Sequence, residues 1–241
     1  MIKVMRLQKK NERLYPSIWR HDWYPLSLLR LRIEEILSEQ GLSRSGMRVL
    51  DIGCGTAPYK PIFTRLGCEY IGCDLKSEDD QSEVNVFIAP GEKIPLEDAS
   101  ADMVVSFEVL EHVADVDFYL SECRRLLKQG GVLLLSAPGV WLYHPHPTDY
   151  RRWTKDGLAY ELESRGLEVR DLKYAVGPLA WTTLFRLFGI REVLMKLPLL
   201  GMFILIPVTI LANLTMIFED LITPEDICLN NASTYIVLAR K

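Results

Sequence analysis

The stretch VLDIGCGTAPYKPIF, residues 49–63, runs from four strand-like residues through Gly53 and Gly55 to a helical pattern around Pro58. A strand, a tight turn with two glycines and a helix start together form a cradle for a small ligand at the carboxyl end of the strand. A dinucleotide-binding fingerprint has a third glycine where this chain has Pro58. This departure disfavours NAD and FAD, so the ligand has to be inferred from the neighbouring residues.

Two carboxylates flank this turn and indicate the charge of its ligand. Asp51 lies two residues before the first glycine, where it would repel a pyrophosphate but attract a cationic group. Asp74 closes the next strand-like run and can accept hydrogen bonds from both hydroxyls of a ribose. The implied ligand is a nucleoside with a positive, phosphate-free tail, and S-adenosylmethionine fits that description. The alternative is that Gly53 and Gly55 merely permit a tight turn.

Strand-like runs alternate with helical ones along most of the chain. Strands are predicted at residues 47–53, 69–75, 84–89, 101–108, 131–137, 167–176 and 233–241. Helices are predicted at residues 25–40, 58–67, 116–131 and 154–166, and Gly130 and Gly131 close the third of these. Nearly continuous apolar strands joined by helices indicate a parallel sheet covered on both faces, so we expect a doubly wound α/β domain.

The chain resembles the class I S-adenosylmethionine-dependent methyltransferases over about residues 47–176 and in its last strand. VLDIGCG is similar to the first motif of that family, and IGCDL to its ribose-binding acidic motif. GEKIPLEDASADMVVSFEVLEHV resembles the adenine loop, the fourth strand and the following helix, and CRRLLKQGGVLLLSAP the fifth strand with its preceding helix. The resemblance implies a Rossmann-like, seven-stranded, mainly parallel sheet whose last strand is antiparallel. The domain would span residues 46–241, after an N-terminal segment and helix at residues 1–45.

The resemblance also implies a set of cofactor-binding residues. These are Asp51, Gly53, Cys54 and Gly55 at the methionine end, Asp74 and Leu75 at the ribose, and Gly91, Glu92 and Phe107 around the adenine loop and fourth strand. One position departs from the family pattern, because Pro90 stands where many relatives have an acidic residue that binds the adenine amino group. Glu92 or backbone groups would then take over that contact.

The acceptor is expected beside the segment PGVWLYHPHPTDYRRWT, residues 138–154, which follows the fifth strand where the crevice opens. Methyl transfer needs alignment of the nucleophile with the methyl group, and an oxygen nucleophile also needs a base. The candidate bases are His144, His146 and Asp149, and the candidate substrate-binding residues are Tyr150, Arg151 and Arg152, whose arginines could clamp a phosphate or carboxylate. The alternative is that Asp149 pairs with Arg151 or Arg152 to hold the loop, while Trp153 packs on the core.

Other classes of function are disfavoured by composition and motifs. A net charge of −4 and the lack of an Asn/Asp-Pro-Pro-Tyr motif argue against a nucleic-acid partner. Five cysteines without zinc-ribbon spacing indicate a reducing compartment. Glu111 and His112 stand together in EVLEHV, but a single histidine beside a carboxylate at a helix start is typical of a cap, so no metal site is expected.

An apolar insertion is predicted at about residues 177–232. Residues 197–218 carry no charge and could span a bilayer by length, but the last strand must return to the sheet, which excludes a single crossing. Pro207 is expected to break this stretch into a helical pair lying in one leaflet, with residues 181–196 as an interfacial amphipathic helix. The alternative is a lid over the substrate pocket or a homodimer interface.

The first 32 residues combine basic and aromatic side chains and suit a membrane surface. Their basic residues are Lys3, Arg6, Lys9, Lys10, Arg13, Arg20, Arg30 and Arg32. The alternative is a solvated helix whose aromatic residues pack on the core. No apolar run follows the basic residues, so no cleavable secretion signal is expected.

Taken together, these features predict a methyltransferase that uses S-adenosylmethionine and acts on a small, apolar or lipid-linked acceptor, such as a polyprenyl-linked sugar or a quinone-like ring. We expect a cytoplasmic location, peripheral or monotopic at the inner membrane face. A non-catalytic scaffold that keeps the fold is the alternative of a different class. The presence of Asp51, Gly53, Gly55 and Asp74 in one chain favours the enzyme.

Overall fold

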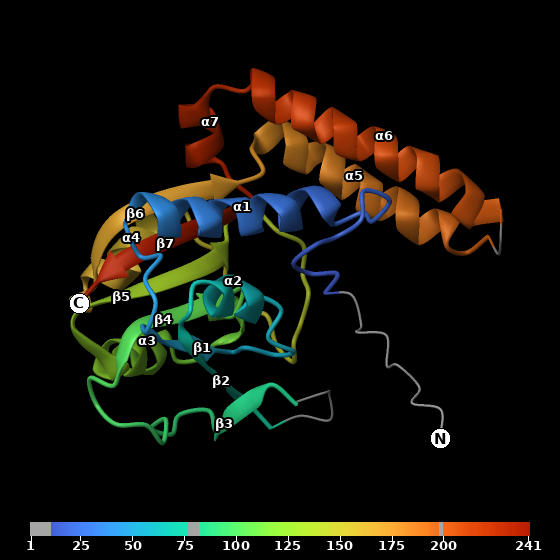
Figure 1. The fold of residues 1–241 in the computed structure, drawn as a ribbon. Helices are drawn as coiled ribbons and strands as arrows, with labels where there is room; N and C mark the ends of the chain where they lie inside the picture. The colour runs from blue at the N-terminus through green and yellow to red at the C-terminus, as the bar shows by residue number, and fades with distance from the viewer. Residues whose placement is uncertain (1–10, 77–81, 198–199) are drawn as a thin grey trace, which may run out of the picture.

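A computed structural model describes residues 11–76, 82–197 and 200–241 of the chain. Its seven strands form one sheet in the order β3-β2-β1-β4-β5-β7-β6 (Figure 1). The strands are β1 Arg48–Ile52, β2 Glu69–Leu75, β3 Val84–Ile88, β4 Ala101–Phe107, β5 Leu127–Pro138, β6 Glu168–Ala175 and β7 Thr234–Arg240. Neighbouring strands are parallel except where β7 pairs with β5 and with β6. The predicted mainly parallel sheet with an antiparallel last strand is confirmed.

Helices cover both faces of this sheet, as the doubly wound prediction requires. They are α1 Trp23–Glu39, α2 Lys60–Arg65, the short 3-10 helix η1 Leu110–His112, α3 Val116–Leu126, α4 Lys155–Glu163, α5 Pro178–Leu194, α6 Leu200–Ile222 and α7 Glu225–Asn230. Successive residues of β5 alternate between two apolar clusters: Leu134 packs with residues of α1 and α2, and Leu135 packs with residues of α3 and α4. The central strand β5 therefore has buried apolar side chains on both faces.

The topology brings the residues of interest to one edge of the sheet. Strand order reverses between β1 and β4, which both run in the same direction as β2 and β5. The carboxyl ends of these four strands therefore lie along the same edge. The glycine turn follows β1, Asp74 ends β2, η1 follows β4 and the loop with the histidines follows β5.

One helix boundary differs from the prediction. The helix expected to continue to Gly131 ends at Leu126. Leu127 is already extended, with φ −68° and ψ 134°, and it pairs with Ala101 as the first residue of β5. Pairing in the sheet outweighs the helical propensity of the following residues, so Gly130 lies inside a long strand and does not close the helix.

The insertion forms a helical hairpin, and the predicted break at Pro207 is wrong. α6 is one continuous helix that contains Pro207, and the chain reverses direction between α5 and α6 instead. Figure 1 shows the two helices side by side and antiparallel, reaching past the sheet. A proline in the second turn removes one backbone hydrogen bond of the helix, and packing against α5 supports the rest.

The polarity of α6 is inverted relative to that of a helix in a soluble protein. Its buried residues are Gly201, Thr209, Asn213 and Met216. The exposed large apolar residues of α6 are Leu200, Met202, Phe203, Ile204, Ile206, Leu211, Leu214, Phe218, Leu221 and Ile222. By length and composition alone α6 could cross a membrane, and only 22% of its most apolar 18-residue window is buried. Asn213 instead points inward, where its side-chain amide donates to the carbonyls of Ile18 at 2.7 Å and Arg20 at 3.0 Å.

The helix α5 also departs from the expected amphipathic pattern. It buries Leu184 and Leu187 against the fold, but Ile190 and Val193 remain exposed to 43% and 64%. Apolar side chains thus lie on both its inner and its outer side. The exposed apolar residues of α5 and α6 form the outer surface of the hairpin, its apolar face.

The N-terminal segment agrees with the alternative given for it only in part, because Tyr24 is buried but Trp19 is 60% exposed, and the membrane interpretation stays a prediction. Lys3, Arg6, Lys9 and Lys10 lie outside the described residues. The side chain of Arg20 pairs with Glu12 at 2.8 Å and with Asp22 at 2.6 Å. Arg30 and Arg32 pair with acidic residues of their own helix, Glu34 and Glu35. α1 packs on the core through Leu29, Ile33 and Ile36.

Candidate active site

The glycine turn after β1 is shaped both by its packing and by its backbone conformation. Gly53 has φ +81°, and its N–H donates to the carbonyl of Cys73 at 2.8 Å. A Cβ on Gly53 would lie 2.5 Å from a methyl carbon of Val109, so only glycine fits. Gly55 has φ +53°, and a Cβ there would meet nothing within 4 Å. The turn is therefore held tightly on its inner side, next to the buried Cys54, and borders open space at Gly55.

The two predicted carboxylates lie on either side of this turn. Asp51 is 2% exposed and accepts a hydrogen bond from the hydroxyl of Tyr70 at 2.5 Å. Burial raises its pKa to about 7. Asp74 accepts hydrogen bonds from the N–H of Gly55 at 2.5 Å and of Leu75 at 2.6 Å. Among the described residues no cation accompanies the buried carboxylate of Asp51, which lies near that of Asp74. A positively charged nucleoside would compensate these charges, so the two residues fit S-adenosylmethionine.

The remaining cofactor candidates lie around the same edge. Phe107 ends β4, is 6% exposed and packs its ring against Tyr59 at 4.8 Å between centroids. Gly91, with φ +73°, and the exposed Glu92 lie in the turn after β3, the strand that neighbours β2. This turn is at the same end of the sheet as Asp74. Contacts of Glu92 with an adenine stay a prediction.

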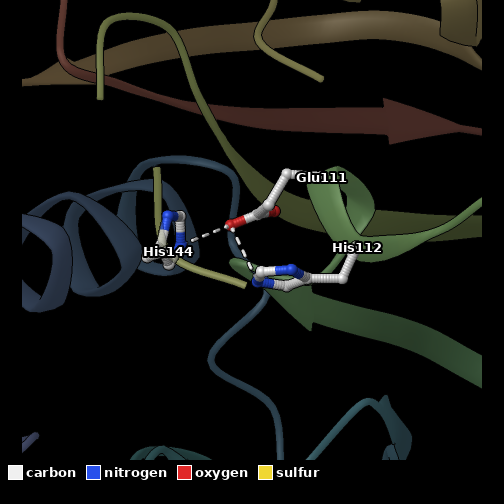
Figure 2. A group of neighbouring side chains, drawn as sticks. All are labelled: Glu111, His112 and His144. Atoms are coloured by element: carbon white, nitrogen blue, oxygen red, sulfur yellow. Dashed lines mark ion pairs between the residues drawn. The ribbon is translucent and has the colours of Figure 1, made fainter. Parts of the chain in front are cut away.

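Glu111 and His112 of η1 form a cluster with His144 of the loop after β5, as Figure 2 shows. One oxygen of Glu111 lies 3.7 Å from Nε2 of His112 and 3.6 Å from Nε2 of His144. The pKa of His144 is raised, first by its interaction with Glu111. The third predicted histidine, His146, is exposed, and its ring centroid is 6.4 Å from that of His112. Of the predicted bases, His144 alone joins the cluster, and no local pattern in the sequence predicts that it lies next to Glu111.

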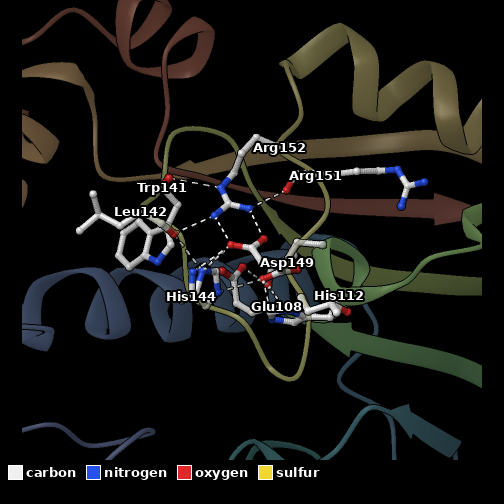
Figure 3. Close-up of polar contacts among 11 residues, drawn as sticks. Glu108, His112, Trp141, Leu142, His144, Asp149, Arg151 and Arg152 are labelled. Atoms are coloured by element: carbon white, nitrogen blue, oxygen red, sulfur yellow. Dashed lines mark hydrogen bonds and ion pairs between the residues drawn. The ribbon is translucent and has the colours of Figure 1, made fainter.

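The loop after β5 is held by an ion pair, the alternative considered for Asp149 and its arginines (Figure 3). Arg152 donates to both carboxylate oxygens of Asp149, at 2.5 and 2.7 Å, and also to the carbonyls of Trp141 and Leu142. These hydrogen bonds hold the pKa of Asp149 well below its usual range, which makes it a poor base at neutral pH. Trp153 packs on the core, with 6% of its surface exposed.

The other predicted substrate-binding residues have local partners as well. Arg151 donates to the carbonyl of Val113 at 2.5 Å and to that of Ala114 at 3.0 Å. Tyr150 is 52% exposed, and its N–H donates to the carbonyl of Glu111 at 2.8 Å. Both guanidinium groups are thus engaged in fastening the loop to the segment after η1 and to itself, and their role as an anion clamp stays a prediction.

Glu108 is a site residue that the sequence reasoning missed. It follows β4 directly and has φ +56°, a strained conformation for a residue with a side chain. The Ser136 hydroxyl donates to its carboxylate at 2.8 Å. Burial, and then the charge of Glu111, raise the pKa of Glu108 to about 7. Figure 3 shows it near His144 and Asp149. The available signal was an acidic residue at the end of a buried strand, three positions before Glu111.

Comparison with known proteins agrees with this geometry. The family described as "Methyltransferase domain" matches residues 50–135. A Mycolicibacterium smegmatis protein, whose name places it among S-adenosylmethionine-dependent methyltransferases, is 30% identical over 178 residues, 67% of this chain and 65% of its own length. A ubiquinone biosynthesis O-methyltransferase of Cereibacter sphaeroides is 30% identical over 165 residues, 57% of this chain and 67% of its own. The chain belongs to the class I S-adenosylmethionine-dependent methyltransferases.

This methyltransferase spans about two thirds of the length of those relatives. Among solved structures, a SAM-dependent methyltransferase from Archaeoglobus fulgidus shares its fold, with a TM-score of 0.54 and 18% identity over 96% of this chain and 97% of that one. S-adenosylmethionine supplies a methyl group carried on a cationic sulfonium. In this methyltransferase Asp51 would stabilise the positive end of the cofactor and Asp74 would accept its ribose hydroxyls.

Proposed function

We propose that this methyltransferase methylates a hydroxyl group of a small apolar or lipid-linked acceptor at the cytoplasmic face of a membrane. The observation that best supports this proposal is that the loop with His144 contacts helix α5 of the apolar hairpin. In this reaction the bond between sulfur and the methyl carbon breaks, a bond between that carbon and the acceptor oxygen forms, and the hydroxyl proton passes to a base. S-adenosylhomocysteine and the methyl ether are the products.

The side chains beside the glycine turn suit a hydroxyl acceptor. An oxygen nucleophile must lose its proton, and Glu108, Glu111 and His144 offer proton-accepting groups at the carboxyl ends of β4 and β5. The name of the Cereibacter sphaeroides relative, an O-methyltransferase of ubiquinone biosynthesis, supports both the oxygen atom and an apolar, ring-containing acceptor. The two arginines of the loop are fastened to backbone carbonyls and Asp149, so a free phosphate or carboxylate is a poorer candidate for recognition.

The hairpin meets the site through a group of aromatic rings. The ring of Trp141, on the loop after β5, contacts those of Phe185 and Phe188 of α5 at 6.1 and 5.9 Å between centroids. The next residue, Leu142, provides the carbonyl to which Nδ1 of His144 hydrogen-bonds at 3.0 Å. The rim between hairpin and loop is itself apolar, because Leu142 and Tyr143 are 43% and 77% exposed. An apolar molecule bound at this rim would thus be close to the cluster.

A membrane surface explains the exposed apolar side chains of the hairpin. A contiguous apolar patch of this length is unusual on a soluble monomer. Both ends of the hairpin connect to the sheet, α5 after β6 and α6 through α7 to β7, so the chain enters and leaves on the same side. We therefore place the hairpin along the interface within one leaflet. All five cysteines are free thiols, which suits the cytoplasmic face.

The proposal is tested with purified protein, methyl-labelled S-adenosylmethionine and a bacterial membrane extract, followed by partition between organic and aqueous phases. Label in the organic phase is expected, and it should be lost in Asp74→Asn but kept in Asp171→Asn, a change on β6 away from the site. Label confined to the aqueous phase would contradict the apolar acceptor and assign the hairpin to a homodimer contact or lid. Intact cofactor binding without any labelled product would favour the scaffold alternative.

A further inference from the structure

Glu111 is a buried carboxylate without a compensating partner. Its side chain is fully buried, and neither oxygen has a hydrogen-bond partner among the residues that the structure describes. A carboxylate taken out of water is costly unless it is paired or coordinates a cation. The two histidines are the nearest groups that could pair with Glu111. Their Nε2 atoms lie 3.6 and 3.7 Å from its carboxylate oxygen, which is longer than the 2.7–3.2 Å typical of a hydrogen bond.

Both histidines use their other ring nitrogen on the backbone. Nδ1 of His112 lies 2.6 Å from the carbonyl of Thr148, and Nδ1 of His144 lies 3.0 Å from that of Leu142. A carbonyl can only accept, so each Nδ1 carries the proton, and in the neutral ring Nε2 then has a free lone pair. Histidine ligands of metals are typically oriented in this way, by an N–H donated to a carbonyl or carboxylate. Two such lone pairs converge on one carboxylate oxygen.

We infer that Glu111, His112 and His144 bind one divalent transition-metal ion. A tetrahedral ion with ligand bonds of about 2.0–2.2 Å holds its ligand atoms about 3.3–3.5 Å apart. The three candidate ligand atoms all lie within 4.8 Å of one another, and two of their separations are 3.6 and 3.7 Å. Small side-chain rotations would close the site. Three protein ligands leave a fourth position open, as in catalytic zinc sites.

The donor set and the surrounding charges indicate the class of ion. Two imidazoles and one carboxylate suit Zn²⁺ or a neighbouring first-row ion better than Mg²⁺ or Ca²⁺, which prefer oxygen ligands. The carboxylate of Glu108 interacts electrostatically with Glu111 and adds negative charge. The nearby positive charge of Arg152 is offset by its ion pair with Asp149.

The site would also give the cluster a chemical role in the proposed reaction. A cation at this position lowers the pKa of a bound hydroxyl and so favours the deprotonated acceptor oxygen. This link alone rests on the proposed function, whereas metal binding itself is independent of any acceptor.

The test is metal binding by the full chain, purified without a histidine tag, stripped with a chelator and dialysed. Zn²⁺ is titrated by calorimetry, and Co²⁺ by its visible absorption, in the absence of S-adenosylmethionine. We expect one ion per chain with a dissociation constant of about 1 μM or lower. His144→Ala and Glu111→Gln should each weaken binding at least about tenfold. His146→Ala, a neighbouring exposed histidine outside the cluster, should leave the affinity unchanged.

The inference is overturned if no saturable binding occurs below roughly 100 μM, or if His146→Ala weakens binding as much as His144→Ala does. A protonated His144 paired with Glu111 would then account for the cluster. Because Glu111→Gln changes a buried residue, its fold is checked by circular dichroism, and His144→Ala on the loop provides the second variant. Stoichiometric binding without organic-phase product would refute the proposed function alone, and product formation by the metal-free protein would refute the role of the ion in catalysis.

Discussion

Two serine substitutions on the apolar face should detach the protein from lipid vesicles. Phe203 and Leu221 are 77% and 78% exposed, and they are 18 residues apart, which is about five helical turns. They therefore lie on the same side of α6. Burying a large apolar side chain completely is worth about 1.5–3 kcal/mol, so each of these, mostly exposed at present, should contribute about 1.5 kcal/mol on insertion.

The double variant Phe203→Ser with Leu221→Ser should therefore lose about 3 kcal/mol, which is roughly a 100-fold weaker partition. Flotation with phosphatidylcholine vesicles measures this directly. Tyr160→Ser is the matched control, since Tyr160 is 72% exposed on α4, which packs on the opposite face of the sheet. An unchanged partition of the double variant, or an equal loss for Tyr160→Ser, would refute the membrane interpretation. A wild-type homodimer that dissociates in the double variant would identify a second copy as the occupant of the apolar face.

The remaining predictions concern three single residues. The pKa of Asp51 lies near 7 in the ligand-free fold, above its ordinary value. The affinity for S-adenosylhomocysteine, which carries a cationic amino group, should therefore rise as the pH increases through about 7. Calorimetry should show that this pH dependence of the affinity disappears in Asp51→Asn. Because the folded state holds this proton to higher pH than the unfolded state, the stability of the ligand-free fold should fall as pH rises from about 4 to 7. Gly53→Ala should lower the free energy of unfolding, measured in urea, by about 2–4 kcal/mol, because of the positive φ and the clash with Val109. Gly41→Ala should lower it by about 1 kcal/mol, because φ is also positive there but a Cβ would meet open space. Asn213→Leu should lower the free energy of unfolding by about 1–3 kcal/mol, because the carbonyl of Ile18 loses its donor and the carbonyl of Arg20 keeps only the N–H of Trp23.

The sheet and the cofactor turn could be predicted because their signals are local. Asp51, Gly53 and Gly55 lie within five residues, and the strand that carries them reads as an apolar run whatever surrounds it. The end of α3 could not be placed, because the extended conformation of Leu127 depends on its partner Ala101 in β4. The course of α6 through Pro207 likewise depends on packing against α5, which a proline rule does not include.

The acceptor side was harder to predict for the same reason. His144 and Glu111 are 33 positions apart, and only the loop geometry brings them to 3.6 Å. Conversely, Arg151 and Arg152 looked available for an anion because the sequence does not show that Val113, Ala114 and Asp149 occupy their donors. Charged residues in a loop can hold the loop or bind a ligand, and their partners decide which.

The inverted polarity of α6 also separates the alternatives for the hairpin. A lid would have to turn its apolar face toward the site, yet the inner side of the hairpin is already fixed by polar contacts. Asn213 binds the carbonyls of the N-terminal segment, and Asp220 accepts from the hydroxyl of Tyr24 at 2.8 Å and from the N–H of Gly177 at 2.9 Å. Rotating the helix would break all of these hydrogen bonds and would leave their donors and acceptors without favourable partners. A membrane or a second copy meets the apolar face as it stands, so these two partners are the ones that the vesicle experiment has to distinguish.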